Sequence, residues 1–332
     1  DKLFTKQTAL TSVTLGEGIK ATSYQMFTGC SSLENVVLPE SLTKIERVTF
    51  AQSGLKSIII PDNVTEIGDQ AFDKCVSLNS VVLGKDSRLE IMGKSVFRNT
   101  SIESFEVPST LKKMGDTVFS GCTQLTTLTL PKSLTDVGNT PFTGCTKLQS
   151  VTVLMKNIPN SAFSNCTGLQ SATIDSESVG TSAFSGCTNL ISVTFSSNLT
   201  DLGASVFKGC TKLVEISLPD TLETIGTNMF ENCTSLSSIH LPDNEYFKTI
   251  PSGMFNGCTS LTEVDLSSIT SIGASAFMGC SALREMIIPS TVTSVGQWAF
   301  RDCSSLSSVV IGENVESIGQ SAFYGTALKE IV

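Results

Sequence analysis

The sequence is poor in the residues that most enzyme sites and nucleic-acid-binding surfaces use. Its 332 residues include one histidine, one tryptophan and three tyrosines, so any histidine-dependent chemistry depends on His240 alone. No run of lysine and arginine interleaved with aromatic residues occurs, and 31 acidic against 22 basic side chains give a net charge of −9. Such a charge repels polyphosphate. The composition therefore argues against nucleic acid as a partner.

Long apolar stretches are also absent. No run approaches the roughly 18 apolar residues that a membrane-spanning helix needs, so no transmembrane segment is predicted. The first residues, Asp1 to Phe4, form neither the basic segment nor the apolar core of an export signal, and the last residues, LKEIV, stop inside a repeated pattern. We expect both ends to be boundaries within a longer protein, so the lack of a signal or an anchor says little about the compartment.

What the chain does have is one unit repeated. AFSGCTNL at 183–190 returns as AFDKCVSL at 71–78 and as AFMGCSAL at 276–283. With 40% hydrophobic and 16% charged residues, the chain can bury a continuous core. A unit of about 23 residues cannot bury its apolar face alone, so the repeats are predicted to stack. The repeats are anchored on fourteen phenylalanines: Phe27, Phe50, Phe72, Phe97, Phe119, Phe142, Phe163, Phe184, Phe207, Phe230, Phe255, Phe277, Phe300 and Phe323.

Each repeat predicts one short strand followed by turns. Six residues after most of these phenylalanines comes Leu-x-x-apolar-x-apolar, as in LTTLTL at 125–130, and the final alternation indicates a strand. Seven of the ten prolines directly follow this pattern, where a residue without an N–H ends strand pairing. In ten repeats a glycine stands four residues before the phenylalanine, which predicts either positive φ or close approach of a neighbouring coil.

The predicted fold class is an α/β repeat solenoid. It is a stack of about 14 coils of about 23 residues, with a parallel β-sheet on one face and short turns or 3-10 segments on the other. We predict a single solenoid domain over residues 1–332, with an atypical N-terminal repeat at 1–27.

Cysteine belongs to the repeat as well. A linear column of stacked side chains does not converge tetrahedrally on zinc, no CxxC pair occurs, and parallel Cβ vectors hold neighbouring sulfurs too far apart for a disulfide. We predict buried thiols, with disulfides and a metal site as the alternatives. All eleven cysteines stand three residues after a phenylalanine: Cys30, Cys75, Cys122, Cys145, Cys166, Cys187, Cys210, Cys233, Cys258, Cys280 and Cys303.

The pattern Leu-x-x-Leu-x-Leu-Pro followed by SLTxIGxxAFxGCSSL resembles the BspA-like, or treponemal-type, leucine-rich repeats. The resemblance implies a leucine-rich-repeat solenoid of a cell-surface or secreted protein, with adhesion to host or matrix proteins as its role. The chain departs from the pattern at 154–180, where repeats lose residues, and at 84–88 and 242–246, where two residues are added. We expect changes in curvature or protruding loops there.

One outward side chain from each strand forms a column on the predicted sheet. Apolar residues at both ends of this column flank a strip of threonine and serine, which is either what a parallel sheet favours or a surface for a partner. The column members from Val37 to Asp265 are our candidate ligand-binding residues. The column is Thr14, Val37, Ile59, Val82, Glu106, Thr129, Thr152, Thr173, Thr194, Ser217, His240, Asp265, Ile287 and Val310.

Three successive members of the column, Ser217, His240 and Asp265, are the residue types of a nucleophile, a base and an orienting acid. An open sheet offers neither an oxyanion hole nor a water-excluding pocket, so a hydrolase is only a remote alternative. A metal site built from His240, Glu263 and Asp265 is similarly disfavoured. We predict no catalytic residue, no metal site and no cofactor.

The leading hypothesis is a non-enzymatic module that binds a protein or glycan ligand through the strand face or the adjoining loops. Adhesion and an extracellular or cell-surface location are what the family resemblance implies. The alternative from another class is a passive structural spacer, or stalk, that presents another domain.

Overall fold

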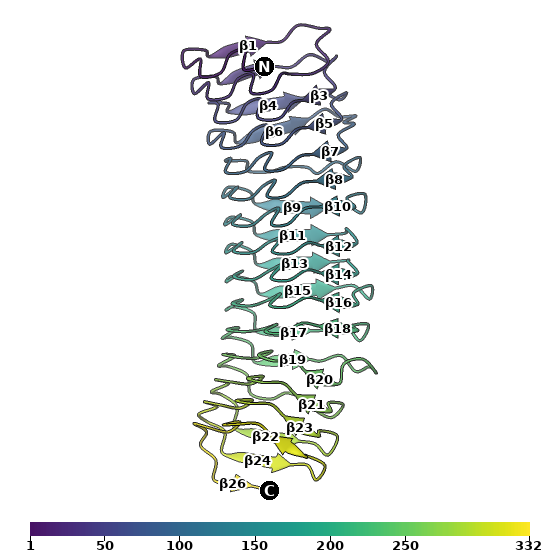
Figure 1. Cartoon of the computed structure of the whole chain (residues 1–332), viewed down its shortest axis with the longest axis vertical. Coiled ribbons are helices and arrows are strands. Elements are labelled where there is room, and N and C mark those ends of the chain that lie inside the picture. Colours follow the sequence, from purple (N-terminus) through teal and green to yellow (C-terminus); the bar gives the residue numbers. More distant parts are fainter. The chain divides into compact units, whose positions relative to one another are not determined.

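The computed structural model describes all 332 residues, and the chain folds into short parallel strands and tight turns without any helix. Accordingly, no helix in it has the length and apolar character needed to cross a membrane. The chain divides into two compact units, Asp1–Leu169 and Gln170–Val332. In both units most coils carry a longer strand of the predicted pattern and a second strand of two residues (Figure 1).

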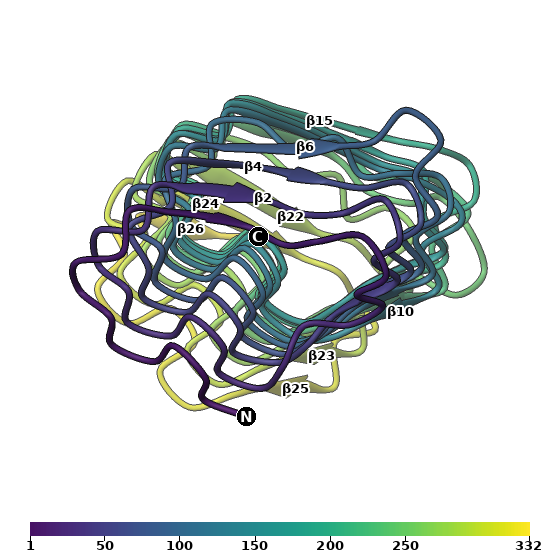
Figure 2. The same ribbon diagram turned by 90° about the horizontal axis from the view of Figure 1, so that it is seen from above.

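In the first unit the longer strands pair as β1 with β2, β4 with β6 and β9 with β11, and the short strands β3, β5, β7, β8 and β10 form one continuous parallel ladder. In Figure 2, β4 and β6 lie on one side of the coils and β10 lies on another. The longer strands are β1 (Ser12–Thr14), β2 (Asn35–Val37), β4 (Ser57–Ile60), β6 (Ser80–Leu83), β9 (Thr127–Leu130) and β11 (Ser150–Val153). The short strands are β3 (Lys44–Ile45), β5 (Glu66–Ile67), β7 (Ile91–Met92), β8 (Lys113–Met114), β10 (Asp136–Val137) and β12 (Asn157–Ile158).

The second unit repeats this plan. The longer strands pair as β13 with β15, β17 with β19, and β22 with β24 and then β26, whereas the short strands form the parallel ladders β14-β16-β18 and β20-β21-β23-β25. The longer strands are β13 (Ser171–Ile174), β15 (Ser192–Phe195), β17 (Glu215–Ser217), β19 (Ser238–His240), β22 (Glu285–Ile288) and β24 (Ser308–Ile311). The two-residue β26 (Glu330–Ile331) continues their ladder at the end of the chain. The short strands are β14 (Ser178–Val179), β16 (Asp201–Leu202), β18 (Thr224–Ile225), β20 (Thr249–Ile250), β21 (Ser271–Ile272), β23 (Ser294–Val295) and β25 (Ser317–Ile318).

The repeat phenylalanines form the core of each unit. Those from Phe27 to Phe300 are at most 1% exposed, and Phe323 in the last coil is half-buried. Within each unit, the rings of successive coils stack with centroids 5.1–5.9 Å apart. Phe4 continues the column, because its ring stacks on Phe27 at 5.4 Å. The atypical N-terminal repeat therefore supplies a ring that covers the end of the column, with Phe4 itself 43% exposed.

The turns around each phenylalanine correct the predicted fold class. The residues two before and two after each of the fourteen repeat phenylalanines have positive φ, as Val48 (61°) and Gln52 (58°) do around Phe50. Left-handed residues at this spacing interrupt a right-handed helix. The α component and the 3-10 segments of the prediction are therefore wrong, and tight turns together with a second parallel ladder occupy that part of the coil. The parallel-strand solenoid itself is confirmed.

The recurrent glycine four residues before the phenylalanine is explained by close approach rather than by positive φ. A Cβ atom on Gly68 would lie 2.6 Å from the backbone nitrogen of Arg47 in the preceding coil, and one on Gly138 would lie 2.4 Å from that of Asp116. Real Cβ atoms do not approach so closely. Neighbouring coils thus touch backbone to backbone at this position.

The eleven cysteines are buried thiols. In ten of them the sulfur lies 2.9–3.4 Å from the carbonyl oxygen of the phenylalanine in the preceding coil, to which the S–H donates. Where a repeat lacks cysteine, a hydroxyl stands in its place, and Thr100 Oγ1 donates to Phe97 O at 2.8 Å. Burial raises the pKa of Cys75 and Cys122 to about 11. Such thiols stay protonated near neutral pH and are poor nucleophiles.

Candidate functional site

The strand face of the first unit carries a cluster of exposed apolar side chains. Val37 on β2, Ile59 on β4 and Val82 on β6 are 59%, 66% and 51% exposed. Ile59 and Val82 are direct partners in the β4–β6 register. We call Val37, Ile59 and Val82 the apolar patch. Three β-branched side chains on successive coils thus leave apolar surface in contact with water.

The rest of the predicted column in this unit is polar. Thr129 and Thr152 are direct partners in the β9–β11 register, with Thr129 exposed and Thr152 half-buried. Glu106 is exposed but lies outside any strand, next to the buried Phe105. The ring of Phe105 packs against Phe119 at 5.1 Å, which adds a second aromatic contact to the core at this coil.

In the second unit the column members also face solvent. Thr173 pairs with Thr194, Ser217 with His240 and Ile287 with Val310, and each of these side chains is exposed. The outward orientation read from the sequence therefore holds on both strand faces, whereas the assignment of these residues to ligand binding stays a prediction.

Ser217, His240 and Asp265 share one face without forming a catalytic relay. His240 Nε2 lies 3.7 Å from Asp220 Oδ1, so the imidazole faces a carboxylate other than that of Asp265. Asp265 Oδ1 instead accepts the backbone N–H of Ser267 at 2.9 Å, and this hydrogen bond lowers the pKa of Asp265. No group of three or more histidine, cysteine or acidic side chains converges as a metal site would require.

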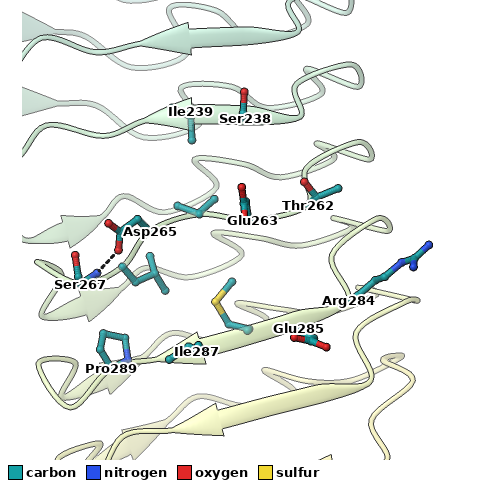
Figure 3. A pocket seen from close by; sticks show the side chains of 13 residues that line it. Ser238, Ile239, Thr262, Glu263, Asp265, Ser267, Arg284, Glu285, Ile287 and Pro289 are labelled. Atoms are coloured by element: carbon teal, nitrogen blue, oxygen red, sulfur yellow. Dashed lines mark hydrogen bonds between the residues drawn. The ribbon is translucent and has the colours of Figure 1, made fainter.

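A hollow of about 760 Å³ opens on the strand face of the second unit, and sequence reasoning did not find it (Figure 3). Residues 238–239 of β19 bound it on one side. Residues 285–287 of β22 bound it on the other, together with Arg284 and Pro289, and residues 262–267 lie between. Two sequence signals mark it in retrospect. No proline follows the pattern LTEVDL at 261–266, and Asp265 stands where most coils have threonine or an apolar residue.

The lining of the hollow combines carboxylates with apolar side chains. Glu263, Asp265 and Glu285 are exposed, and Arg284 is the single basic residue among the lining residues. Val264 is half-buried, although the same inward position is fully buried in most coils, as at Met286 (4% exposed). The hollow therefore offers acidic groups beside accessible apolar surface.

Comparisons with known proteins bear on the family. No curated protein shows significant similarity to the chain. The structure resembles that of a leucine-rich repeat protein from Bacteroides ovatus, with 28% identity, a TM-score of 0.72, and coverage of 97% of this chain and 86% of that one. It also resembles a leucine-rich repeat protein from Eubacterium ventriosum, with 24% identity, a TM-score of 0.58, and coverage of 96% and 84%.

The family profile agrees with this likeness. The BspA type leucine rich repeat region (6 copies) matches residues 1–125, 90–214, 156–264 and 244–332. These matches cover the whole chain and correspond to the stacked coils, with their phenylalanine column and buried thiols. The chain therefore belongs to the family of BspA-type leucine-rich repeat proteins.

Proposed function

We propose that this chain is a non-enzymatic binding module that recognises a protein partner through the apolar patch of the first unit. The observation that carries the proposal is the exposure of Val37, Ile59 and Val82, three apolar side chains held at fixed spacing by strands β2, β4 and β6. Burying such surface against a partner is favourable by roughly 25 cal/mol per Å² of apolar area. Adhesion at the surface of a cell is the biological role that the family resemblance supports.

A protein fits this surface better than a glycan does. The centre of a protein interface is depleted in charged residues and is more apolar than its rim. The apolar patch has no charged member, and polar residues such as Asn35 and Ser57 occupy the other outward positions of the same strands. The patch thus has the composition of a small interface core, with neighbouring polar groups available for hydrogen bonds.

The experiment is a quantitative binding assay of the purified chain against immobilised extracellular-matrix proteins, with collagen and fibronectin as the first probes. The test variant is Ile59→Glu with Val82→Glu, which places charge in the patch without touching the buried core. Thr129→Glu is the matched control, because it adds charge at the same repeat position outside the patch. We expect the test variant to bind at least about tenfold more weakly and the control to match the parent. Equal binding by all three proteins would show that the apolar patch is not the binding surface. No binding by the parent would favour the spacer.

A further inference from the structure

The hollow in the second unit coincides with a break in the ladder of longer strands. Residues 262–266 occupy the strand position of their repeat, yet they form no strand and make no main-chain hydrogen bond to β19 or β22. A side-chain bond from Thr262 Oγ1 to Ser237 O, at 3.5 Å, is the contact that remains. The turns of the same coils stay joined, because Phe255 N donates to Ala276 O at 2.8 Å. The coils therefore separate on the strand face alone.

Asp265 accounts for one of the hydrogen bonds that is missing at this break. In coils with an intact ladder, the residue after the strand donates its N–H to the preceding coil, as Gly84 does to Ile60 O and Ser196 to Ile174 O, both at 2.9 Å. The equivalent residue here is Ser267, and its N–H donates to the side chain of Asp265 instead. The carboxylate thus captures a donor that would otherwise pair with the neighbouring coil.

The break leaves backbone groups that an extended chain can satisfy. Backbone N–H and C=O groups at an unpaired strand edge are a template for another strand, and peptide recognition by strand addition uses such edges. Residues 262–267 line the hollow along their whole length, with β19 and β22 on either side. The unpaired backbone of residues 262–265 can supply hydrogen bonds, and the half-buried Ile239 and Val264 can supply apolar contacts, within one site.

The charged residues that line the hollow favour a partner with basic side chains. Glu263, Asp265 and Glu285 outnumber Arg284, and neither Glu263 nor Glu285 forms an ion pair within the chain. Carboxylates of this kind attract lysine and arginine side chains and repel acidic ones. Alternate side chains of an extended peptide point to the same side, so basic residues at every second position can meet these carboxylates.

We infer that the hollow between β19 and β22 is a docking site for an extended, basic peptide segment, which pairs with the backbone of residues 262–265. This site is separate from the apolar patch of the first unit and does not depend on it. The acidic residues that line the hollow require a basic segment. The unpaired backbone groups at the strand position require an extended one.

The test uses the full chain and synthetic peptides followed by calorimetry. The probe is a blocked eight-residue peptide that alternates lysine with threonine. The comparison peptides replace lysine by glutamate, or methylate the amides on the pairing side of the lysine peptide. We expect the lysine peptide to bind and both comparison peptides to bind at least about tenfold more weakly, with affinity falling as salt rises. Equal binding of the methylated peptide, or no binding of the lysine peptide, would overturn the inference. Binding of a neutral oligosaccharide instead would also do so.

Variants locate the site. Asp265→Thr places threonine at the repeat position that Thr129 and Thr152 occupy on β9 and β11. We expect the Ser267 N–H to donate to the preceding coil in this variant, which narrows the hollow. Glu263→Gln with Glu285→Gln removes charge and keeps the shape, so it tests the site even if the first variant folds poorly. Both should lower the peptide affinity at least about tenfold, whereas Glu215→Gln, which removes an exposed carboxylate on β17 that does not line the hollow, should not. Unchanged affinity in the glutamine variant would refute the assignment.

Binding of matrix proteins through the apolar patch should be the same in all of these variants, so failure of one proposal leaves the other standing.

Discussion

Val48 is a β-branched residue in a backbone conformation that suits glycine or asparagine. Its φ is 61°, and the same position of the repeat is occupied by Asn228 and Gly253 in other coils, with φ of 56° and 65°. A non-glycine residue held in this region costs of order 1–3 kcal/mol, and asparagine tolerates it better than valine does. The stacked coils on both sides hold the strained residue in place.

We therefore predict that Val48→Asn stabilises the protein by about 1 kcal/mol. Urea unfolding followed by circular dichroism measures the change. Thr117→Asn, at the same repeat position, should gain less because it also loses the hydrogen bond between Thr117 Oγ1 and Ser95 Oγ at 2.7 Å. A lower unfolding midpoint in Val48→Asn than in the parent would show that the packing of the valine outweighs the backbone strain.

For individual residues, the sequence predicts which side chains form the core but not which hydrogen bonds the core residues make. Phe and Cys recur at fixed spacing, so their burial follows from the period alone. Phe4 was missed because the segment around it does not match the repeat, although its ring stacks on Phe27. The donation of each cysteine S–H to a phenylalanine carbonyl depends on the three-dimensional path of the turn, which the spacing does not report.

The two-residue strands show what periodicity cannot detect. A strand such as β5 (Glu66–Ile67) has one inward and one outward residue, too short for alternation to stand out. Its pairing with β3 and β7 depends on neighbouring coils rather than on local preference. The longer strands were predictable because inward and outward residues alternate over three or four positions. The hollow was not, because residues 261–266 keep the apolar alternation of a strand although they form none, and the hydrogen bond from Ser267 to Asp265 is not visible in the spacing.

Hydrogen exchange should reveal the break in the ladder at residues 262–266. Amides of residues 262–266 should exchange with deuterium at least about 100-fold faster than those of residues 191–195, whose coil is joined to its neighbour by Ile191 N to Gln170 O and Ser196 N to Ile174 O, both at 2.9 Å. Hydrogen exchange read by mass spectrometry resolves the two segments. Similar protection in both would mean that the ladder is continuous and the hollow closed.

The buried thiols should make the stability of the whole molecule depend on pH in the alkaline range. Burial is the main cause that raises the pKa of Cys75 and Cys122 from 9.0 to about 11, and that of Cys233 and Cys303 to about 12. The folded thiol keeps its proton to higher pH than the unfolded thiol. The stabilisation of the folded protein by these protonated thiols is therefore fully present below the pKa of the unfolded thiol, 9.0. It is lost as the pH rises through the pKa values of the folded thiols, 11 to 12.

Urea unfolding should accordingly show a lower midpoint at about pH 10.5 than at about pH 8. Lysine and tyrosine also titrate in this range, so the control is the double variant Cys75→Ser with Cys122→Ser. Serine is neutral throughout, and Ser53 and Thr100 already occupy the equivalent position in two coils. The variant should lose less stability over the same pH interval than the parent. An equal loss in both proteins would show that the thiols do not cause it.

The central claim for the whole molecule is that recognition takes place on the strand faces, while the phenylalanine and cysteine columns only build the stack. Hydroxyl-radical footprinting of the chain with and without a bound matrix protein tests this most directly, because oxidation reports the exposure of individual side chains. We predict that oxidation of Val37, Ile59 and Val82 falls on binding, whereas that of Tyr246 and Tyr324, which are 58% and 63% exposed in the second unit, stays the same. Unchanged oxidation of the apolar patch, with protection confined to the turns around the phenylalanines, would contradict the account.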